Sequence, residues 1–284
     1  MDAILRKERD GACGGNFGRV LAQGDGWRAL DVICTAGPHD RPFEERHGWT
    51  SISLLLGGTF AYRSSQGPLL MSSGALMLGR PGESFECSHP HGVGDRCISF
   101  QFAPEQFEEL VRAAGAGATF DQDRIPPLRE LAAVSARATD AINNVGALEE
   151  IALELAGAVI RLEAHALVAT SVRDRNRIAE VVRYLEAHSD RNDSLAELAR
   201  MTQLSRYHFL RTFTNVIGIT PHQWILRVRL REAARRLAST HQPITGIALD
   251  IGFEDLSNFI RSFRAEFGVS PRRYRMTRIR RTPS

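Results

Sequence analysis

Two segments near the C-terminal end of the chain repeat one pattern: a short apolar helix, a tight turn and a second helix. The first runs from Ser194 to Gly218 and the second from Pro243 to Gly268. Ser194 and Glu197, three residues apart, form the sequence of a capping box, which marks the start of a helix. Two such segments in tandem predict a pair of helix-turn-helix motifs.

The segment between the two motifs, residues 220–239, predicts one unbroken helix. Its apolar residues recur at helical spacing on one side. The expectation is that its arginines lie mostly on the outside: Arg227, Arg229, Arg231, Arg235 and Arg236. A helix of this length spans about 30 Å. Because successive major grooves on one face of DNA lie roughly 34 Å apart, this helix could hold the two motifs in neighbouring grooves.

Positive charge is concentrated in the same part of the chain. Residues 171–284 carry 21 arginines, no lysine and 11 acidic residues, a net charge of +10, whereas the preceding part carries −7. A basic helical region is what binding to DNA phosphates requires. The charge distribution therefore predicts double-stranded DNA as a partner of this region.

The stretch IALDIGFEDLSNFIRSFRAEFGVSPRRYR resembles the signature of AraC/XylS-type transcriptional regulators, and the resemblance extends over residues 173–277. It implies a seven-helix DNA-binding domain whose recognition helices begin near Ser205 and Asp255. It further implies base-edge or phosphate contacts at Ser205, Arg206, Tyr207, Arg211, Leu256, Ser257, Asn258 and Arg261. Leu210 stands where the family often has a polar residue, so contact with a thymine methyl group is expected there. RNA polymerase would be a further partner of an activator.

The sequence pattern of the N-terminal part predicts β-strands up to about Phe102. Its short apolar or alternating runs are broken by Gly, Pro and Ser, which suits a small antiparallel barrel. Helices are expected after Pro104 and Pro127. With the family resemblance, the predicted fold class is α+β. Residues 1–170 form a cupin-like β-barrel with flanking helices, residues 171–284 form an all-α domain with the two motifs, and residues 171–177 form a hinge.

An apolar stripe runs along the helical segment that begins at Leu148. Leu155, Val159 and Leu162 fall on this stripe. The family resemblance implies that helices in this position join two copies of the chain, which predicts a homodimer. The alternative is that the stripe packs on the chain's own barrel.

The segment from Glu86 to Cys97 gathers soft and borderline metal ligands. Cys87, His89, His91 and Cys97 lie within a dozen residues, and thiolate and imidazole ligands suit a transition metal such as zinc. Further candidate ligands at the same barrel mouth lie upstream: His39, Glu45 and His47. Two alternatives stay open: a turn-rich loop whose histidines and cysteines are structural, and a thiol that senses redox or alkylation chemistry.

Composition narrows the class of protein further. No apolar run reaches membrane-spanning length, and the N-terminus has charges where a signal peptide needs an apolar stretch. The expected location is therefore the cytoplasm, where Cys13, Cys34, Cys87 and Cys97 would be thiols or ligands rather than disulfides. No Walker loop or dinucleotide-binding signature is present.

The function that follows is sequence-specific transcriptional regulation without enzymatic activity. The N-terminal domain is expected to sense a small-molecule effector or a metal, to dimerise, or to do both. Two alternatives remain. One is a cupin-type metal-dependent enzyme domain fused to the DNA-binding domain, and the other is a constitutive regulator that has no ligand.

Overall fold

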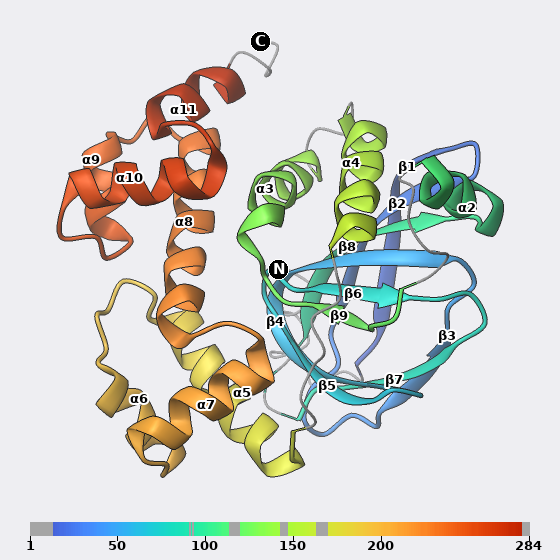
Figure 1. The fold of residues 1–284 in the computed structure, drawn as a ribbon, viewed down its shortest axis with the longest axis horizontal. Coiled ribbons are helices and arrows are strands. Elements are labelled where there is room, and N and C mark those ends of the chain that lie inside the picture. The colour runs from blue at the N-terminus through green and yellow to red at the C-terminus, as the bar shows by residue number, and fades with distance from the viewer. Residues whose placement is uncertain are drawn as a thin grey trace.

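The structure is a computed structural model. It describes residues 14–90, 92, 94–113, 120–142, 147–162 and 170–279. A sheet-rich N-terminal part and a helical C-terminal part lie side by side (Figure 1). This arrangement confirms the predicted mixed fold class in outline. None of the described helices combines the length and the apolar character that a membrane span requires.

The N-terminal strands pair around one long strand. The strands are β1 (Asn16–Gly24), β2 (Trp27–Cys34), β3 (Phe43–Arg46), β4 (Thr50–Ser64), β5 (Gly67–Ser72), β6 (Leu76–Gly79), β7 (Ser84–Ser88), β8 (Asp95–Phe102) and β9 (Arg124–Ile125). The first half of β4 pairs with β8 and β6, and its second half pairs with β5 and β7. The register of β4 against β8 shifts between Leu55 and Gly57, so the strand can change sheets at this bulge.

The strand order explains why a closed barrel is not confirmed. One path runs β1-β2-β8-β4-β6-β9; beside it β5 and β7 pair with β4, and β3 pairs with β7. Among the described residues, these pairings do not close into a ring. The predicted cupin-like barrel is thus not confirmed: the strands form two sheets that share β4, with apolar side chains between them such as Leu55, Phe60 and Met71.

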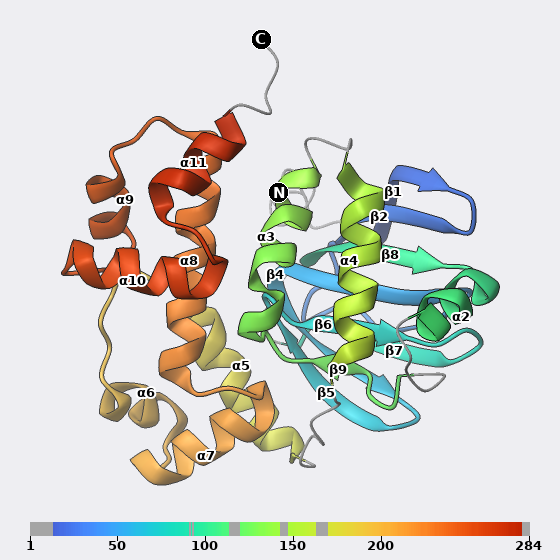
Figure 2. The same ribbon diagram turned by 45° about the horizontal axis from the view of Figure 1, so that its top comes forward.

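Three helices cover one face of the sheet: α2 (Pro104–Ala113), α3 (Ala132–Ala141) and α4 (Leu148–Arg161) (Figure 2). A short 3-10 turn, η1 (Arg129–Leu131), precedes α3. Leu155 and Val159 of α4 are 0% and 3% exposed and belong to the core beneath these helices, and Leu162 packs against the same core. The stripe is therefore buried inside the chain and does not present a surface to a second copy. This arrangement corresponds to the alternative in which the stripe packs on the chain's own sheet.

The C-terminal part contains seven described helices. They are α5 (Val172–Ala187), α6 (Leu195–Thr202), α7 (Arg206–Ile217), α8 (Pro221–Ser239), α9 (Ile244–Asp250), α10 (Leu256–Phe267) and α11 (Pro271–Ile279). The predicted hinge at residues 171–177 is instead the start of α5. Ser171 caps this helix by accepting from the Asp174 N–H, and the Arg175 guanidinium donates to the Thr170 carbonyl. Because a capped helix has its first N–H groups satisfied, this segment is ordered.

The helical part has two apolar cores, and each includes a residue from the N-terminal part. Phe209 and Phe213 of α7 pack with α5 and α6, and Leu70 of β5 joins them. The second core surrounds α10 and includes Ala136 of α3. The two parts are thus held together by shared apolar contacts in addition to the chain that connects them.

A buried arginine adds a polar connection between the parts. Arg124 of β9 is 1% exposed, and its Nη1 donates to the carbonyls of Leu70 at 2.7 Å and Val216 at 2.6 Å. Burial lowers the pKa of this guanidinium to about 10. Arg124 therefore holds the C-terminal end of α7 to the edge of the sheet.

Candidate nucleic-acid interface and a pocket between the two parts

The first helix-turn-helix unit has the caps and turn that its sequence predicts. Ser194 makes the full capping box with Glu197, and Ser205 caps α7 by accepting from the His208 N–H. Between them Gln203 takes the left-handed conformation, with φ 56°. Gly218 ends α7 in the same conformation. The sequence thus fixes both ends of α7 locally.

The face of α7 turned away from the core carries most of the residues expected to contact DNA. Phe209 and Phe213 are fully buried on the inner side. Ser205, Arg206 and Arg211 are exposed, and Leu210 is 36% exposed on the same outer side. Tyr207 lies in the first turn of α7, and its side chain is outside the described atoms. The outer face of α7 therefore combines cationic groups with one apolar side chain.

The second unit repeats this arrangement around α10. The Asp255 carboxylate caps α10 by accepting from the N–H groups of Ser257 and Asn258. Gly252 follows α9 with φ +89°, and a Cβ there would lie 2.4 Å from the Asp190 carbonyl oxygen. Only glycine fits this turn without displacing backbone. The second helices of the two units, α7 and α10, thus begin directly after Ser205 and Asp255, close to the predicted positions.

The outer face of α10 is polar at its start and mixed further along. Leu256, Ser257, Asn258 and Arg261 are all exposed. The inner face is built from Phe259, Phe263 and Phe267, whose rings pack in sequence. Figures 1 and 2 both show α6 and α7 at one end of α8 and α9 and α10 at the other end. The two exposed faces are therefore separated by the length of α8.

The prediction that the arginines of α8 lie mostly outside is wrong for three of them. Arg227 pairs with Glu266, and Arg229 and Arg231 bond to backbone carbonyls. The reason is that α8 packs against α3, α5, α7, α9, α10 and α11, so it has no broad side facing solvent. These charges hold the domain together and are not part of an exposed basic surface.

Arg229 links the segment that leads into the first helix-turn-helix unit to the turn of the second unit. Its guanidinium donates to the carbonyls of Ser189 and Arg191, both at 2.6 Å, in the segment between α5 and α6. It also donates to the Gly252 carbonyl at 3.0 Å, in the turn of the second unit. A single side chain thus holds the segment between α5 and α6 against the turn between α9 and α10.

We expect Arg229→Ala to lower the free energy of unfolding by roughly 2–3 kcal/mol, because three carbonyls lose a charged donor. Arg235→Ala is the matched control on the same helix. Arg235 is 59% exposed and its guanidinium pairs with Glu232, so its loss should cost less than about 1 kcal/mol. Urea unfolding of both variants measures the difference. Equal losses would show that Arg229 does not link these two segments.

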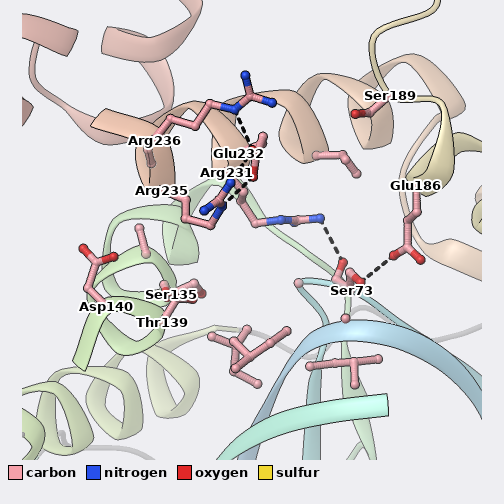
Figure 3. A pocket seen from close by; sticks show the side chains of 18 of the residues that line it. Ser73, Ser135, Thr139, Asp140, Glu186, Ser189, Arg231, Glu232, Arg235 and Arg236 are labelled. Atoms are coloured by element: carbon pink, nitrogen blue, oxygen red, sulfur yellow. Dashed lines mark hydrogen bonds and ion pairs between the residues drawn. The ribbon is translucent and has the colours of Figure 1, made fainter. Parts of the chain in front are cut away.

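A cavity of about 620 Å³ lies where α3, α5 and α8 meet the sheet (Figure 3). One side is apolar and includes Leu54 and Leu55 of β4. The other side carries charged and hydroxyl groups from α5, α8 and the turn after β5, among them Ser73, Glu186 and Arg231. The pocket is thus lined by both parts of the chain, which no sequence pattern indicated.

Two charged groups of the pocket, Arg231 and Glu186, are largely withdrawn from water. Burial lowers the pKa of Arg231 to about 10, against the effect of Glu186. Arg231 Nη2 donates to the Ser73 carbonyl at 3.3 Å, and a Cβ on Gly74 would lie 2.1 Å from its Nη1, so the turn after β5 needs glycine there. Burial also raises the pKa of Glu186 to about 7, and the Ser73 hydroxyl donates to this carboxyl.

The raised pKa of Glu186 predicts a pH-dependent stability. A carboxyl whose pKa is higher in the folded state favours folding at low pH, and this contribution is lost as pH rises from 4.5 through about 7. We expect wild type to lose about 2–3 kcal/mol relative to Glu186→Gln between pH 5 and pH 8. Urea unfolding at both pH values tests this. A difference between the two proteins that stays constant with pH would contradict it.

The predicted metal ligands are only partly brought together. Cys87 and His89 are buried at alternate positions, as a shared strand face requires, but β7 ends at Ser88. Burial raises the pKa of the Cys87 and Cys97 thiols well above their usual value, with a smaller contribution from Asp95. His91 and Cys13 lie outside the described residues. Cys34, Cys87 and Cys97 are free thiols, as expected.

The upstream histidines and Glu45 do not join this group. His39 is exposed, and Glu45 accepts from the Asn16 amide. His47 is buried between Tyr62 and Ser51, and burial lowers its pKa to about 4. The residues that do meet His89 are Asp95 and Cys34. The sequence prediction missed both, because they approach His89 only through strand pairing.

Comparison with known proteins finds matches to the helical C-terminal part of the chain. A family model described as a helix-turn-helix domain matches residues 198–277. The HTH-type transcriptional activator AarP of Providencia stuartii is 30% identical over 100 residues, which cover 35% of this chain and 74% of AarP. The chain belongs to the AraC family of helix-turn-helix transcriptional regulators.

Other members of the family differ in length outside this region. The probable transcriptional regulator LumQ of Photobacterium leiognathi is 36% identical over 101 residues, which cover 36% of this chain and 41% of LumQ. The chain thus matches less than half the length of that relative. The uncharacterised regulator YbfI of Bacillus subtilis is 28% identical over 201 residues, 66% of this chain and 70% of YbfI.

Solved structures of related proteins include one with DNA. The DNA-binding domain of AdpA, solved in complex with a target DNA, is 31% identical to the matching part of this chain. The match covers 37% of this chain and 96% of the AdpA domain, with a TM-score of 0.36. ToxT of Vibrio cholerae is 11% identical and covers 90% of this chain and 99% of that chain, also with a TM-score of 0.36.

Proposed function

We propose that this regulator binds a specific DNA sequence by placing α7 and α10 in two successive major grooves. The observation that carries the proposal is the pair of capped helices at the two ends of α8, each with a phenylalanine core behind it and an exposed polar face. The 19 residues of α8 span about 28 Å. This length is close to the roughly 34 Å repeat of the major groove.

The proposed contacts divide into base reading and positioning. Arg211 and Arg261 occupy the middle of the exposed faces, where a guanidinium can bond to guanine O6 and N7. The starts of the two helices contribute hydroxyl, amide and cationic groups to base edges or phosphates, and Leu256 contributes an apolar contact. These residues are Ser205, Arg206 and Tyr207 on α7 and Leu256, Ser257 and Asn258 on α10.

A selection from random duplexes followed by affinity measurements tests this proposal. On the selected sequence we expect Arg261→Ala to lose roughly 1–3 kcal/mol of binding free energy, with a smaller loss on random DNA. Arg63→Ala is the matched control, since Arg63 is exposed on the sheet and pairs with Glu86. Equal losses of binding free energy on both DNAs would show that Arg261 contacts only phosphate. Failure to enrich any sequence would contradict the proposed function.

We also propose that residues 1–170 act as the sensing domain and residues 171–284 as the DNA-binding domain, with the effector in the pocket between them. The pocket supports this because a molecule bound there contacts β4, α3 and α8 at once. An effector would therefore alter how the two parts pack. The relatives are regulators, which favours a sensor over an enzyme for the N-terminal domain.

A thermal-shift screen of small metabolites tests the pocket. A true effector should raise the melting temperature of the full chain and change its affinity for the selected DNA. Both effects should be lost in Arg231→Gln, because Arg231 lines the pocket. An effector whose effects persist in that variant binds elsewhere, and the pocket assignment is then wrong.

A further inference from the structure

Three buried side chains from different strands converge at one end of the sheets. Cys34 is the last residue of β2, Asp95 is the first residue of β8, and His89 directly follows β7. They are 4%, 7% and 3% exposed. One donor atom from each lies within 4.8 Å of the donor atoms of the other two. Sulfur, nitrogen and oxygen donors thus meet in a space shielded from solvent.

We propose that Cys34, His89 and Asp95 form a binding site for a transition metal ion, with Zn²⁺ as the best fit. Zinc accepts thiolate, imidazole and carboxylate ligands at about 2.0–2.3 Å, which places tetrahedral ligand atoms about 3.5 Å apart. Donor atoms within 4.8 Å can reach that spacing with small side-chain movements. Three protein ligands leave a fourth position for a water molecule or another ligand.

An unpartnered nitrogen supports the site independently of this spacing. His89 Nε2 bonds to Asp95 Oδ2 at 2.6 Å, whereas His89 Nδ1 is buried without a hydrogen-bond partner. Buried polar side-chain atoms are normally satisfied, so this nitrogen indicates a missing partner.

The backbone around the three side chains is held in place without a metal. Cys34 and Asp95 are directly opposite each other in the β2–β8 pair, so their side chains share a face. Next to them, the Gly94 N–H donates to the Ala36 carbonyl at 2.7 Å. Gly58, with φ +88°, lies so close that a Cβ would be 2.5 Å from the Gly94 oxygen. The backbone contacts therefore hold the three proposed ligand residues close together.

The site changes the ligand set that the sequence predicted. His89 is retained, but Cys34 and Asp95 replace Cys87 and Cys97 around it. Cys87 and Cys97 lie two residues from His89 and Asp95, on the same strand faces, since side chains alternate along a strand. They are outside the group whose donor atoms lie within 4.8 Å. Variants at these two thiols can therefore distinguish the two ligand sets.

The test uses the full chain, stripped with a chelator and then titrated with Co²⁺ alone and with Zn²⁺ alone. We expect one Co²⁺ per chain with a thiolate-to-cobalt absorption band, and a higher melting temperature with Zn²⁺. Cys34→Ser should abolish the band. Asp95→Asn should weaken Zn²⁺ affinity roughly 10–100-fold. His47→Gln is the matched control, since this buried histidine bonds to Tyr62 and Ser51 instead.

Each result decides for or against the site. Wild type that binds no metal, or that binds Co²⁺ without a thiolate band, overturns the proposal. So does a Cys34→Ser variant that keeps the band while Cys87→Ser or Cys97→Ser removes it, because the ligand set is then the one read from the sequence. DNA affinity and circular dichroism show whether each variant is folded. If Cys34→Ser does not fold, Asp95→Asn and the wild-type spectrum carry the test.

Discussion

Arg124→Ala is expected to lower the free energy of unfolding by about 3–5 kcal/mol. The substitution leaves a cavity where a fully buried side chain was, and it removes the donor from two carbonyls. The carbonyls belong to Leu70 on the sheet and Val216 on α7. The variant should therefore also weaken the attachment of the helical part to the sheet.

Urea unfolding followed by circular dichroism measures this change, and limited proteolysis reports on the attachment. Arg63→Ala is the control within the same sheet, because Arg63 is 62% exposed and its ion pair with Glu86 should contribute less than about 1 kcal/mol. A loss below about 1 kcal/mol for Arg124→Ala would contradict the role given to this residue.

Phe263→Ala is expected to cost about 3–5 kcal/mol and to abolish DNA binding by the second unit. Phe263 is fully buried, and its ring contacts Phe259, Phe267 and Tyr274 at centroid distances of 5.6, 4.5 and 5.4 Å. Without this ring α10 loses the centre of its inner face. The exposed face that we expect to contact DNA then loses its support.

Ile260→Ala on the same helix separates this loss of packing from loss of contact. Ile260 is 39% exposed, so its truncation should change stability by less than about 1 kcal/mol. Thermal unfolding of both variants is the measurement. If Phe263→Ala unfolds like Ile260→Ala, the phenylalanine core is not what supports α10.

The features that the sequence predicted well are those set by neighbours along the chain. A capping box at Ser194, a hydroxyl cap at Thr220 before Pro221, and glycines at helix ends act within one helical turn. They therefore locate both helix-turn-helix units to within a residue or two. Phe259, Phe263 and Phe267 recur at intervals of four residues, and this helical spacing places all three on the buried face of α10.

The features that the sequence did not predict depend on contacts between distant segments. The arginines of α8 have the spacing of an outer face, but packing on most sides of that helix turns Arg227, Arg229 and Arg231 inward. Likewise, Cys34 and Asp95 are 61 positions apart and meet only because β2 and β8 pair in one particular register. The stripe with Leu155 was ambiguous between a dimer face and a core, and periodicity cannot separate the two.

Footprinting of the full chain on its selected DNA tests the central proposal most directly. Hydroxyl-radical protection should appear in two segments about one helical turn apart, on one face of the duplex. Arg211→Ala should weaken protection in one segment and Arg261→Ala in the other, because α7 and α10 lie at opposite ends of α8. A single protected segment at saturation, weakened by one variant and unaffected by the other, would contradict reading by two helices.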